Sequence, residues 1–476
     1  MSSKERLVVI GGVAAGMSAA SSFKRMKPQD ESYVLEKDHF ISYGVCSLPY
    51  YISDDVKDIV SLISLTPEKA TQERGITVLT RHEALRIDPA QKQVVVTDLN
   101  ANETKTVSYD KLVIATGGLP VKPPLPGIDL KHIFSVRTLN DGMEIKRFID
   151  RWTSSSDSAP ERTAENRTGV RKNIMKAVIV GGGYIGMEMC ESLKKRGLDI
   201  TVIEKMDRVL GNMDSSVTGI VEDKLRSEGV TLRKGVSVEG FEGKDEAVTR
   251  VITDKGPCDA DIVILAIGTR PNTAVARAAG VMLGAGGAIT VDEFLRTNVP
   301  DILAAGDCAE ATHLVTGKKV YIPLGTTANK QGRIAGENAA GARHIFEGIV
   351  GTAVTKIFDL EVARTGLSPL EADHEGYHYF VSTIQGTSRS SAYPAGKALT
   401  VTYVVEAETG RLLGAQMAGV EGVAHRIDTL AACLYNRMSI EDVARLDLGY
   451  APPFATVWDP ILIAANVALK KLQKPE

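Results

Sequence analysis

Residues 7–16 read LVVIGGVAAG and residues 177–186 read AVIVGGGYIG. Each stretch is a short apolar run followed by a glycine cluster, and a second apolar run further on ends in an acid, Glu36 or Glu204. Glycines let a turn pass close to a pyrophosphate, which the free amides and positive dipole of the next helix stabilise, and the acid binds the adenosine ribose. The sequence therefore predicts two βαβ units that each bind a dinucleotide.

The two glycine clusters differ in one respect. In the second, Gly181, Gly183 and Gly186 complete the GxGxxG pattern, and Glu204 lies 23 residues after Gly181, near the usual spacing of about 20. In the first, Val13 occupies the central glycine position, so the backbone approaches its ligand slightly differently. The expected dinucleotide contacts are Gly11, Val13, Ala14, Ala15, Gly16, Glu36, Lys37 and Ser42 in the first unit, and Gly181, Gly183, Tyr184, Ile185, Gly186 and Glu204 in the second.

Composition limits what the chain can do. Its 476 residues suggest about three domains. With 56 Lys and Arg against 59 Asp and Glu there is no basic excess, which argues against a nucleic-acid partner. Its 5 cysteines form no CxxC pair, so neither a disulfide framework nor a metal site is expected.

The apolar segments of the chain are short. None approaches the roughly 18 residues that a membrane span needs, and the run Leu7 to Ile10 is too short for a signal peptide. We therefore expect no membrane partner. The cysteine pattern fits a reducing compartment, so the cytoplasm is the expected location.

Three further segments carry a family resemblance. Residues 111–118 read KLVIATGG, residues 264–272 read ILAIGTRPN and residues 302–307 read ILAAGD. With the two glycine clusters, they make the chain resemble the FAD-dependent pyridine nucleotide-disulfide oxidoreductases over almost all of its length. The resemblance implies that the first two segments are crossovers between domains, that Asp307 contacts the ribityl chain of FAD, and that further cofactor contacts are Thr116, Gly117, Gly268, Thr326, Thr327 and Ala328.

The resemblance also implies the architecture. The expected fold is α/β, with two Rossmann-like dinucleotide-binding domains of the three-layer ββα/αβ type and a C-terminal α+β dimerisation domain. The polar, Ser-rich segment near 151–173 is predicted to be a surface insertion or mobile loop. The predicted parts are 1–125 and 296–345 for FAD, 126–295 for NAD(P)H, and 346–476 for dimerisation.

Cys46 is the expected redox group. It lies ten residues after Glu36, and an extended chain covers about 33 Å in that distance, so Cys46 can reach the flavin ring while Glu36 holds the ribose. If Ser47 begins a helix, the helix dipole would lower the pKa of the thiol. The alternative, a small buried hydrophobic residue, is preferred for the other cysteines, Cys190, Cys258, Cys308 and Cys433.

The surroundings of Cys46 indicate a subgroup. Tyr51 stands where the disulfide reductases of the family have a second cysteine, and Ala14 stands where peroxide-reducing members have a histidine. The chain is similar instead to the single-cysteine coenzyme A-disulfide reductases and NADH-dependent persulfide reductases. Val45 and Ser47 depart from that pattern beside the cysteine.

The same resemblance implies further site residues. Tyr393 and Tyr450 would come from the partner subunit of a homodimer and approach the cysteine, where a phenol can protonate a departing thiolate. Packing is the alternative for both tyrosines. Lys24 and Arg25 lie where relatives hold coenzyme A phosphates, although cations at a helix carboxyl end also simply complement its dipole.

The predicted function is hydride transfer from NAD(P)H through FAD to Cys46, which reduces small disulfide, persulfide or polysulfide substrates, with coenzyme A as a possible ligand. Glu204 favours NADH because a carboxylate repels a 2′-phosphate, whereas Lys205 and Arg208 could admit NADPH. One alternative is an NADH oxidase that reduces oxygen through a Cys46 sulfenic acid. Another is a flavin-binding redox sensor or interaction protein.

Overall fold

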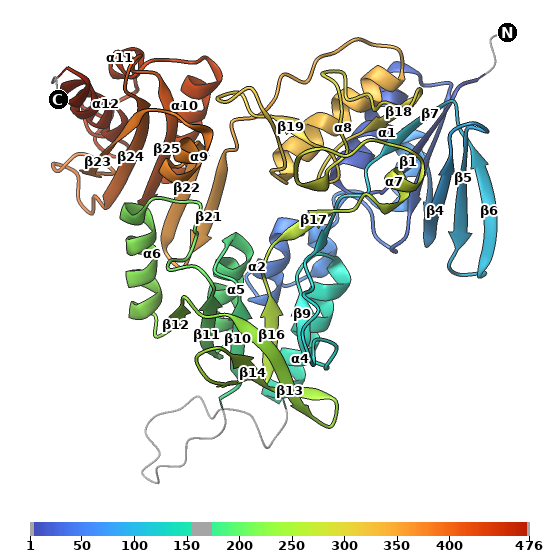
Figure 1. Ribbon diagram of the computed structural model, residues 1–476, viewed down its shortest axis with the longest axis horizontal. Helices are drawn as coiled ribbons and strands as arrows, with labels where there is room; N and C mark the ends of the chain where they lie inside the picture. Colours follow the sequence, from blue (N-terminus) through green and yellow to red (C-terminus); the bar gives the residue numbers. More distant parts are fainter. Residues whose placement is uncertain (1–3, 155–173, 474–476) are drawn as a thin grey trace.

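The computed structural model describes residues 4–154 and 174–473, which form three parts arranged side by side (Figure 1). The part that begins at the N-terminus lies at one end, and the C-terminal part lies at the other. The middle segment of the chain forms the second part, which contacts both.

The first part is built on a parallel sheet in the order β18-β7-β1-β2-β3. Val8 and Val9 of β1 point to opposite faces and are both fully buried, because helices cover one face and a second sheet covers the other. The elements of this part are β1 (Arg6–Ile10), α1 (Ala14–Met26), β2 (Glu31–Glu36), α2 (Leu48–Ile52), α3 (Pro67–Arg74), β3 (Thr77–Thr80), the antiparallel β4 (His82–Asp88), β5 (Gln93–Asp98) and β6 (Glu103–Ser108), then β7 (Lys111–Ile114), α7 (Ala274–Ala278), β18 (Ile302–Ala304), β19 (Ala311–Thr312), β20 (Lys319–Val320) and α8 (Gly325–Ala339).

The second part repeats this plan. Its parallel sheet has the order β12-β11-β10-β16-β9, and an antiparallel β13-β14-β15 sheet packs on it. The elements are β9 (Ile133–Ser135), α4 (Leu139–Ser154), β10 (Lys176–Val180), α5 (Tyr184–Lys195), β11 (Asp199–Glu204), α6 (Ser215–Ser227), β12 (Thr231–Lys234), β13 (Val238–Lys244), β14 (Ala247–Thr253), β15 (Cys258–Asp259) and β16 (Ile262–Leu265). The chain crosses between the two parts through a ribbon of β8 (Gly118–Pro120) and β17 (Thr269–Pro271).

The third part is an antiparallel sheet in the order β21-β22-β25-β24-β23, with helices packed on it. The elements are β21 (Ala353–Ile357), β22 (Leu360–Gly366), α9 (Pro369–Glu375), β23 (Tyr379–Thr387), β24 (Ala398–Glu406), β25 (Leu412–Gly419), α10 (Val423–Tyr435), α11 (Ile440–Ala444) and α12 (Pro460–Leu472). The β21–β22 hairpin projects from this part towards α5 of the second part (Figure 1).

The predicted fold class, with two Rossmann-like parts and a C-terminal α+β part, is confirmed. The exact domain boundaries stay a prediction. One expectation is wrong at its start: the segment from Arg151 was predicted to lack regular structure, but α4 continues to Ser154 because its amphipathic pattern extends that far. The rest of that segment, 155–173, lies outside the described residues.

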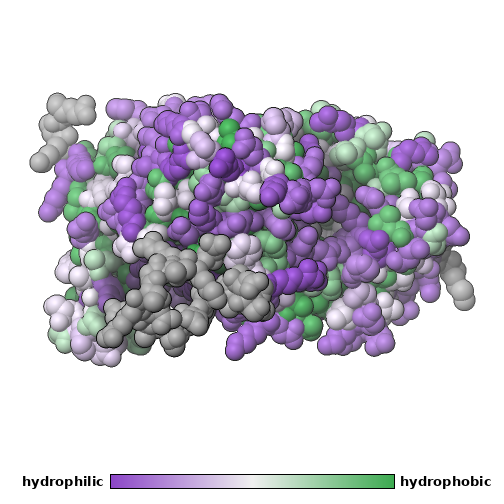
Figure 2. Space-filling view, turned by 90° about the horizontal axis from the view of Figure 1, so that it is seen from below, coloured by the Kyte–Doolittle hydropathy of each residue, from purple (hydrophilic) through white to green (hydrophobic). Residues whose placement is uncertain are grey.

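Among the described residues, no helix has both the length and the apolar character that a transmembrane span requires. The face seen in Figure 2 is largely hydrophilic, with hydrophobic residues scattered over it.

Helices α1 and α8 approach each other closely because glycines face a backbone. A Cβ on Gly332 would lie 2.8 Å from the carbonyl carbon of Ala15, and one on Gly336 would lie 2.8 Å from that of Ala19. Such distances are shorter than any real contact of this kind, so both positions require glycine. This contact fixes the amino ends of α1 and α8 relative to each other.

We expect Gly336→Ala to lower the free energy of unfolding by about 1–3 kcal/mol, because the added methyl group forces the two helices apart. The matched control is Gly219→Ala within α6, where a new Cβ meets nothing within 4 Å. That control should be neutral or stabilise by about 0.5–1 kcal/mol. Denaturant unfolding of both variants measures the difference, and equal effects would contradict the packing argument.

Candidate redox site

The first glycine cluster forms a tight turn between β1 and α1. Gly11 has a φ of +103°, and a Cβ there would lie 2.9 Å from the carbonyl carbon of Ala115. A Cβ on Gly16 would likewise lie 2.9 Å from the carbonyl carbon of Gly11. No side chain caps the first turn of α1, so its amides are free to bind an anion.

Glu36 closes this turn from the end of β2. Its carboxylate accepts a hydrogen bond of 2.7 Å from the amide of Gly12, and burial raises the pKa of the carboxyl group. Lys37 follows directly in the sequence. The geometry matches the place of the acid that binds an adenosine ribose.

The second glycine cluster has the same geometry between β10 and α5. Gly181 has a φ of +107°, and a Cβ there would lie 2.7 Å from the carbonyl carbon of Ala266. A Cβ on Gly183 would meet nothing within 4 Å, so this glycine leaves open space in front of the helix. Glu204 accepts hydrogen bonds from the amide of Gly182 at 2.6 Å and from that of Met206 at 2.7 Å.

The residues expected near the flavin ring converge from separate segments. Asp307 follows β18 and forms an ion pair of 2.9 Å with Arg137, which follows β9. Thr116 donates a hydrogen bond to the carbonyl of Asn272, which ties the two crossover segments together. The hydroxyl of Tyr321 is buried beside Gly118 and Thr269 of the crossover ribbon.

The amino end of α8 lies in the same part of the fold. Its cap residue Leu324 provides no side-chain hydrogen bond, so the amides of its first turn, which includes Thr326, Thr327 and Ala328, stay available. The uncapped first turns of α1, α5 and α8, with the carboxylates of Glu36 and Glu204 beside the first two, fit two dinucleotides. Gly117 and Gly268 both have positive φ values, +69° and +110°, next to this region.

Cys46 is exposed and lies in the short 3₁₀ turn Val45–Ser47. The segment that carries it is anchored on the first glycine cluster, because the amide of Ser42 donates to the carbonyl of Gly12 at 2.9 Å. Leu62 holds the next turn through a hydrogen bond from the amide of Gly44. The structure therefore fixes the cysteine at a set position relative to the turn formed by the first glycine cluster.

The thiol of Cys46 does not have the lowered pKa that the sequence suggested. Desolvation by the surrounding protein raises its pKa, the carboxylates of Glu188 and Asp307 raise it further, and Arg137 opposes them. The expectation failed because α2 has only five residues and Cys46 lies before it, where the dipole is weak. Of the other cysteines, Cys190, Cys308 and Cys433 are buried as expected, whereas Cys258 is partly exposed.

Glu188 is a residue that sequence reasoning missed. It lies on α5, accepts a hydrogen bond of 3.1 Å from Thr355 of β21, and has a pKa raised to about 7 by burial. It also raises the pKa of Tyr50, which reaches about 12, mainly through desolvation. Its position after the second glycine cluster was the available signal, but nothing in the sequence shows that α5 turns it towards Cys46.

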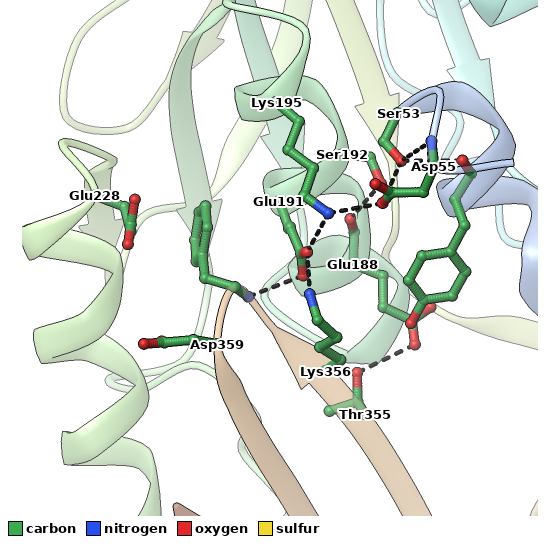
Figure 3. Close-up of polar contacts among 12 residues, drawn as sticks. Ser53, Asp55, Glu188, Glu191, Ser192, Lys195, Glu228, Thr355, Lys356 and Asp359 are labelled. Atoms are coloured by element: carbon green, nitrogen blue, oxygen red, sulfur yellow. Dashed lines mark hydrogen bonds and ion pairs between the residues drawn. The ribbon is translucent and has the colours of Figure 1, made fainter. Parts of the chain in front are cut away.

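Glu191, one turn further along α5, is the centre of a three-part junction (Figure 3). It is 3% exposed and accepts hydrogen bonds from the amide of Phe358 at 2.9 Å and from Lys356, both in the third part. Lys195 lies 2.9 Å from Glu191 and 2.7 Å from Asp55, which follows α2, the short helix after Cys46. One carboxylate thus joins the second glycine cluster's helix to both neighbouring parts.

The remaining predicted residues lie elsewhere. Tyr393 and Tyr450 are exposed on loops of the third part, and neither phenol makes a hydrogen bond within residues 4–154 and 174–473. Lys24 donates to the carbonyls of Pro28 and Asp30, both at 2.7 Å, so it is engaged by the turn that follows α1. Arg25 donates to Ser22 at 2.7 Å.

We expect the free energy of unfolding to fall as the pH rises, because of Glu188. Its folded-state pKa of about 7 lies above the ordinary value of 4.5, so the folded chain holds a proton that the unfolded chain has lost, and stability falls between about pH 4.5 and 7. Relative to Glu188→Gln, the parent should lose on the order of 2 kcal/mol between pH 5 and pH 8. Denaturant unfolding at both pH values measures this, with the exposed Glu239→Gln as the control that should show no such change.

Comparison with known proteins agrees with this geometry. Residues 5–332 match the pyridine nucleotide-disulphide oxidoreductase family, and residues 352–460 match the dimerisation domain of that family. A Pyrococcus abyssi protein named NAD(P)H sulfur oxidoreductase (CoA-dependent) is 39% identical, with 98% of each chain covered, and a Methanocaldococcus jannaschii NADH oxidase is 36% identical, over 98% of this chain and 99% of the other.

A solved structure titled as a NAD-dependent persulfide reductase from A. fulgidus superposes with a TM-score of 0.91 at 36% identity, over 98% of this chain and 83% of the other. The predicted enzyme class and its cofactors, FAD and a pyridine nucleotide, are thereby confirmed. The chain belongs to the pyridine nucleotide-disulphide oxidoreductase family.

Proposed function

We propose that this protein transfers hydride equivalents from NAD(P)H through FAD to Cys46 and thereby reduces small disulfides, persulfides or polysulfides, with coenzyme A-linked substrates as the favoured class. One observation carries the proposal: the exposed Cys46 lies on a segment anchored to the first glycine turn, and Glu188, on the helix of the second glycine cluster, is near enough to raise the pKa of its thiol. Tyr51 stands five residues after Cys46, where the disulfide reductases of the family have a second cysteine, so Cys46 cannot form a dithiol pair with that position. The relatives named above as a CoA-dependent sulfur oxidoreductase and a persulfide reductase support the substrate class.

The cofactors have defined holders in this chain. Gly11, Gly16 and Glu36 would hold the adenosine half of FAD, and Asp307 its ribityl chain, with Arg137 orienting the Asp307 carboxylate. The α5 turn would hold the pyridine nucleotide. When bound, FAD supplies a two-electron carrier that accepts hydride from NAD(P)H and passes the electrons to sulfur.

Cys46 performs the sulfur chemistry. Its thiolate attacks one sulfur of the substrate, so that a new S–S bond forms on Cys46, the old one breaks and the first thiolate departs. Two electrons then cleave the mixed disulfide, which restores Cys46 and releases the second thiolate. NADH, one disulfide and one proton thus give NAD⁺ and two thiols.

A homodimer would complete the site. The dimerisation-domain match supports it, as do the exposed apolar residues Phe454, Val457 and Trp458 on the loop that carries Tyr450. In the dimer, Tyr393 and Tyr450 would reach the Cys46 of the partner subunit and protonate the departing thiolate. Arg25, whose guanidinium is less committed than the Lys24 ammonium, is the better candidate for a coenzyme A phosphate. We place the enzyme in the cytoplasm, because free cysteines fit a reducing compartment.

Oxygen reduction is the second candidate function. The NADH oxidase relative favours it, and Cys46 would then cycle through a sulfenic acid. Oxygen consumption that matches NADH oxidation, with no gain on adding disulfide or polysulfide, would identify this activity. Membership of an enzyme family argues against the third interpretation, a redox sensor.

We expect Cys46→Ser to lose disulfide and polysulfide turnover by about 100-fold or more, because the nucleophile is gone, while FAD reduction by NADH persists. Anaerobic stopped-flow flavin reduction and steady-state turnover with a panel of disulfides, persulfides and polysulfide separate the two steps. Cys258→Ser, at a second cysteine with some solvent exposure, is the matched control and should keep both. Full turnover by Cys46→Ser would exclude Cys46 from the mechanism.

Coenzyme choice should depend on the charge of Glu204. In Glu204→Gln an amide oxygen still accepts the hydrogen bond from Gly182, but the repulsion of a 2′-phosphate is lost. The ratio of kcat/KM for NADPH to that for NADH should rise about tenfold, which corresponds to about 1.4 kcal/mol. A parent enzyme that already reacts faster with NADPH would overturn the assignment of Glu204.

A further inference from the structure

The loops that carry Tyr393 and Tyr450 are separate in sequence but meet at their bases. The first loop follows β23 and returns to β24, closed by hydrogen bonds in both directions between Ser388 and Lys397. The second leads from α11 to α12 and ends at Asp459. A Cβ on Gly386 would lie 3.2 Å from the ring of Pro460, so the two bases lie side by side.

Arg426 of α10 lies between these bases. Its guanidinium donates to Asp459, with nitrogen–oxygen distances of 2.8 and 2.9 Å, and to the carbonyl of Ser388 at 3.0 Å. A further hydrogen bond of 2.9 Å to the carbonyl of Gly422 holds the guanidinium against the start of α10. Arg426 is 9% exposed, Asp459 7% and Ser388 1%, so the whole contact is buried.

Each partner of Arg426 in turn orders its loop. Asp459 caps α12 by accepting a hydrogen bond of 2.9 Å from the amide of Ile461. Beside Ser388, Arg389 pairs with Glu421 at 2.8 Å and lies 5.6 Å from the ring centre of Tyr393. A displacement of the guanidinium would therefore be transmitted to both tyrosine loops.

We propose that Arg426 is a positioning residue for the second half-reaction, in which the reduced enzyme reduces the disulfide. Arg426 holds the two tyrosine loops in fixed relative positions, so that both phenols reach the cysteine of the partner subunit. This inference rests on the proposed function, because it assigns no role to Arg426 apart from the two tyrosines. The planar guanidinium suits this task, since it donates to a carboxylate and a carbonyl in different directions at once. A lysine ammonium keeps the charge but cannot reproduce that fork.

The test separates the two half-reactions in the intact holoenzyme. Arg426→Lys should leave FAD content and the rate of flavin reduction by NADH unchanged, and should slow reoxidation of the reduced enzyme by a small disulfide about ten- to a hundredfold, through misplacement of the phenols. Tyr393→Phe and Tyr450→Phe should slow the same step. The double variant Arg426→Lys with Tyr450→Phe should be no slower than the slower single variant, because the arginine acts through the tyrosine.

The matched control is Arg364→Lys. Arg364 lies on β22 of the third part, is 6% exposed and is paired with Glu371, and within the described residues no hydrogen bond joins it to either tyrosine loop. It should keep the rate of reoxidation by disulfide. If Arg426→Lys fails to fold, Asp459→Asn provides the same test from the other side of the ion pair, because its remaining oxygen still caps α12.

The outcomes distinguish the inference from the proposed function. Slow reoxidation in the tyrosine variants with normal reoxidation in Arg426→Lys would overturn the inference alone. Normal reoxidation in both tyrosine variants would overturn their proposed role, and the inference with it. An equal loss of both half-reactions and of FAD in Arg426→Lys would show a purely structural residue and would also overturn the inference.

Discussion

The structure depends on the close approach of two backbones at each glycine turn. Gly11 and Gly181 end their strands with positive φ values and face the carbonyls of Ala115 and Ala266, which follow the neighbouring parallel strands. A side chain at either glycine would separate the turn from the adjacent strand. Because this contact is made at the carboxyl ends of both sheets, it places both helix amino ends where a dinucleotide can bind.

Much of the fold was predictable because its signals are local. An apolar run, a glycine cluster and an acid after the next strand are contiguous in sequence, and the amides of Gly12 and Gly182 donate to Glu36 and Glu204 as that pattern implies. The fold of the third part was expected from the family resemblance, and the match to the dimerisation domain agrees with it. The end of α4 was missed because a polar, Ser-rich composition hid the continuing helical face.

The site was less predictable where it depends on contacts between distant segments. Arg137 matches no motif, yet it pairs with Asp307 across 170 residues of sequence. Desolvation by the surrounding protein, and then Glu188 and Asp307, raise the pKa of the Cys46 thiol, whereas the sequence offered only the local helix dipole, which favoured the opposite direction. Local patterns report backbone geometry well, but the electrostatic environment of a thiol is a property of the whole fold.

The junction around Glu191 limits how the three parts can be recombined. Glu191 lies on the helix of the second glycine cluster. Its carboxylate is neutralised by Lys356 from the third part and by Lys195, which also binds Asp55 after α2. A chimaera whose β21–β22 hairpin had no cation at position 356 would leave this buried acid with Lys195 as its one remaining counter-charge among these residues. We therefore expect the three parts to be exchanged between homologues together. The joining points of an engineered chimaera belong outside the residues of this junction.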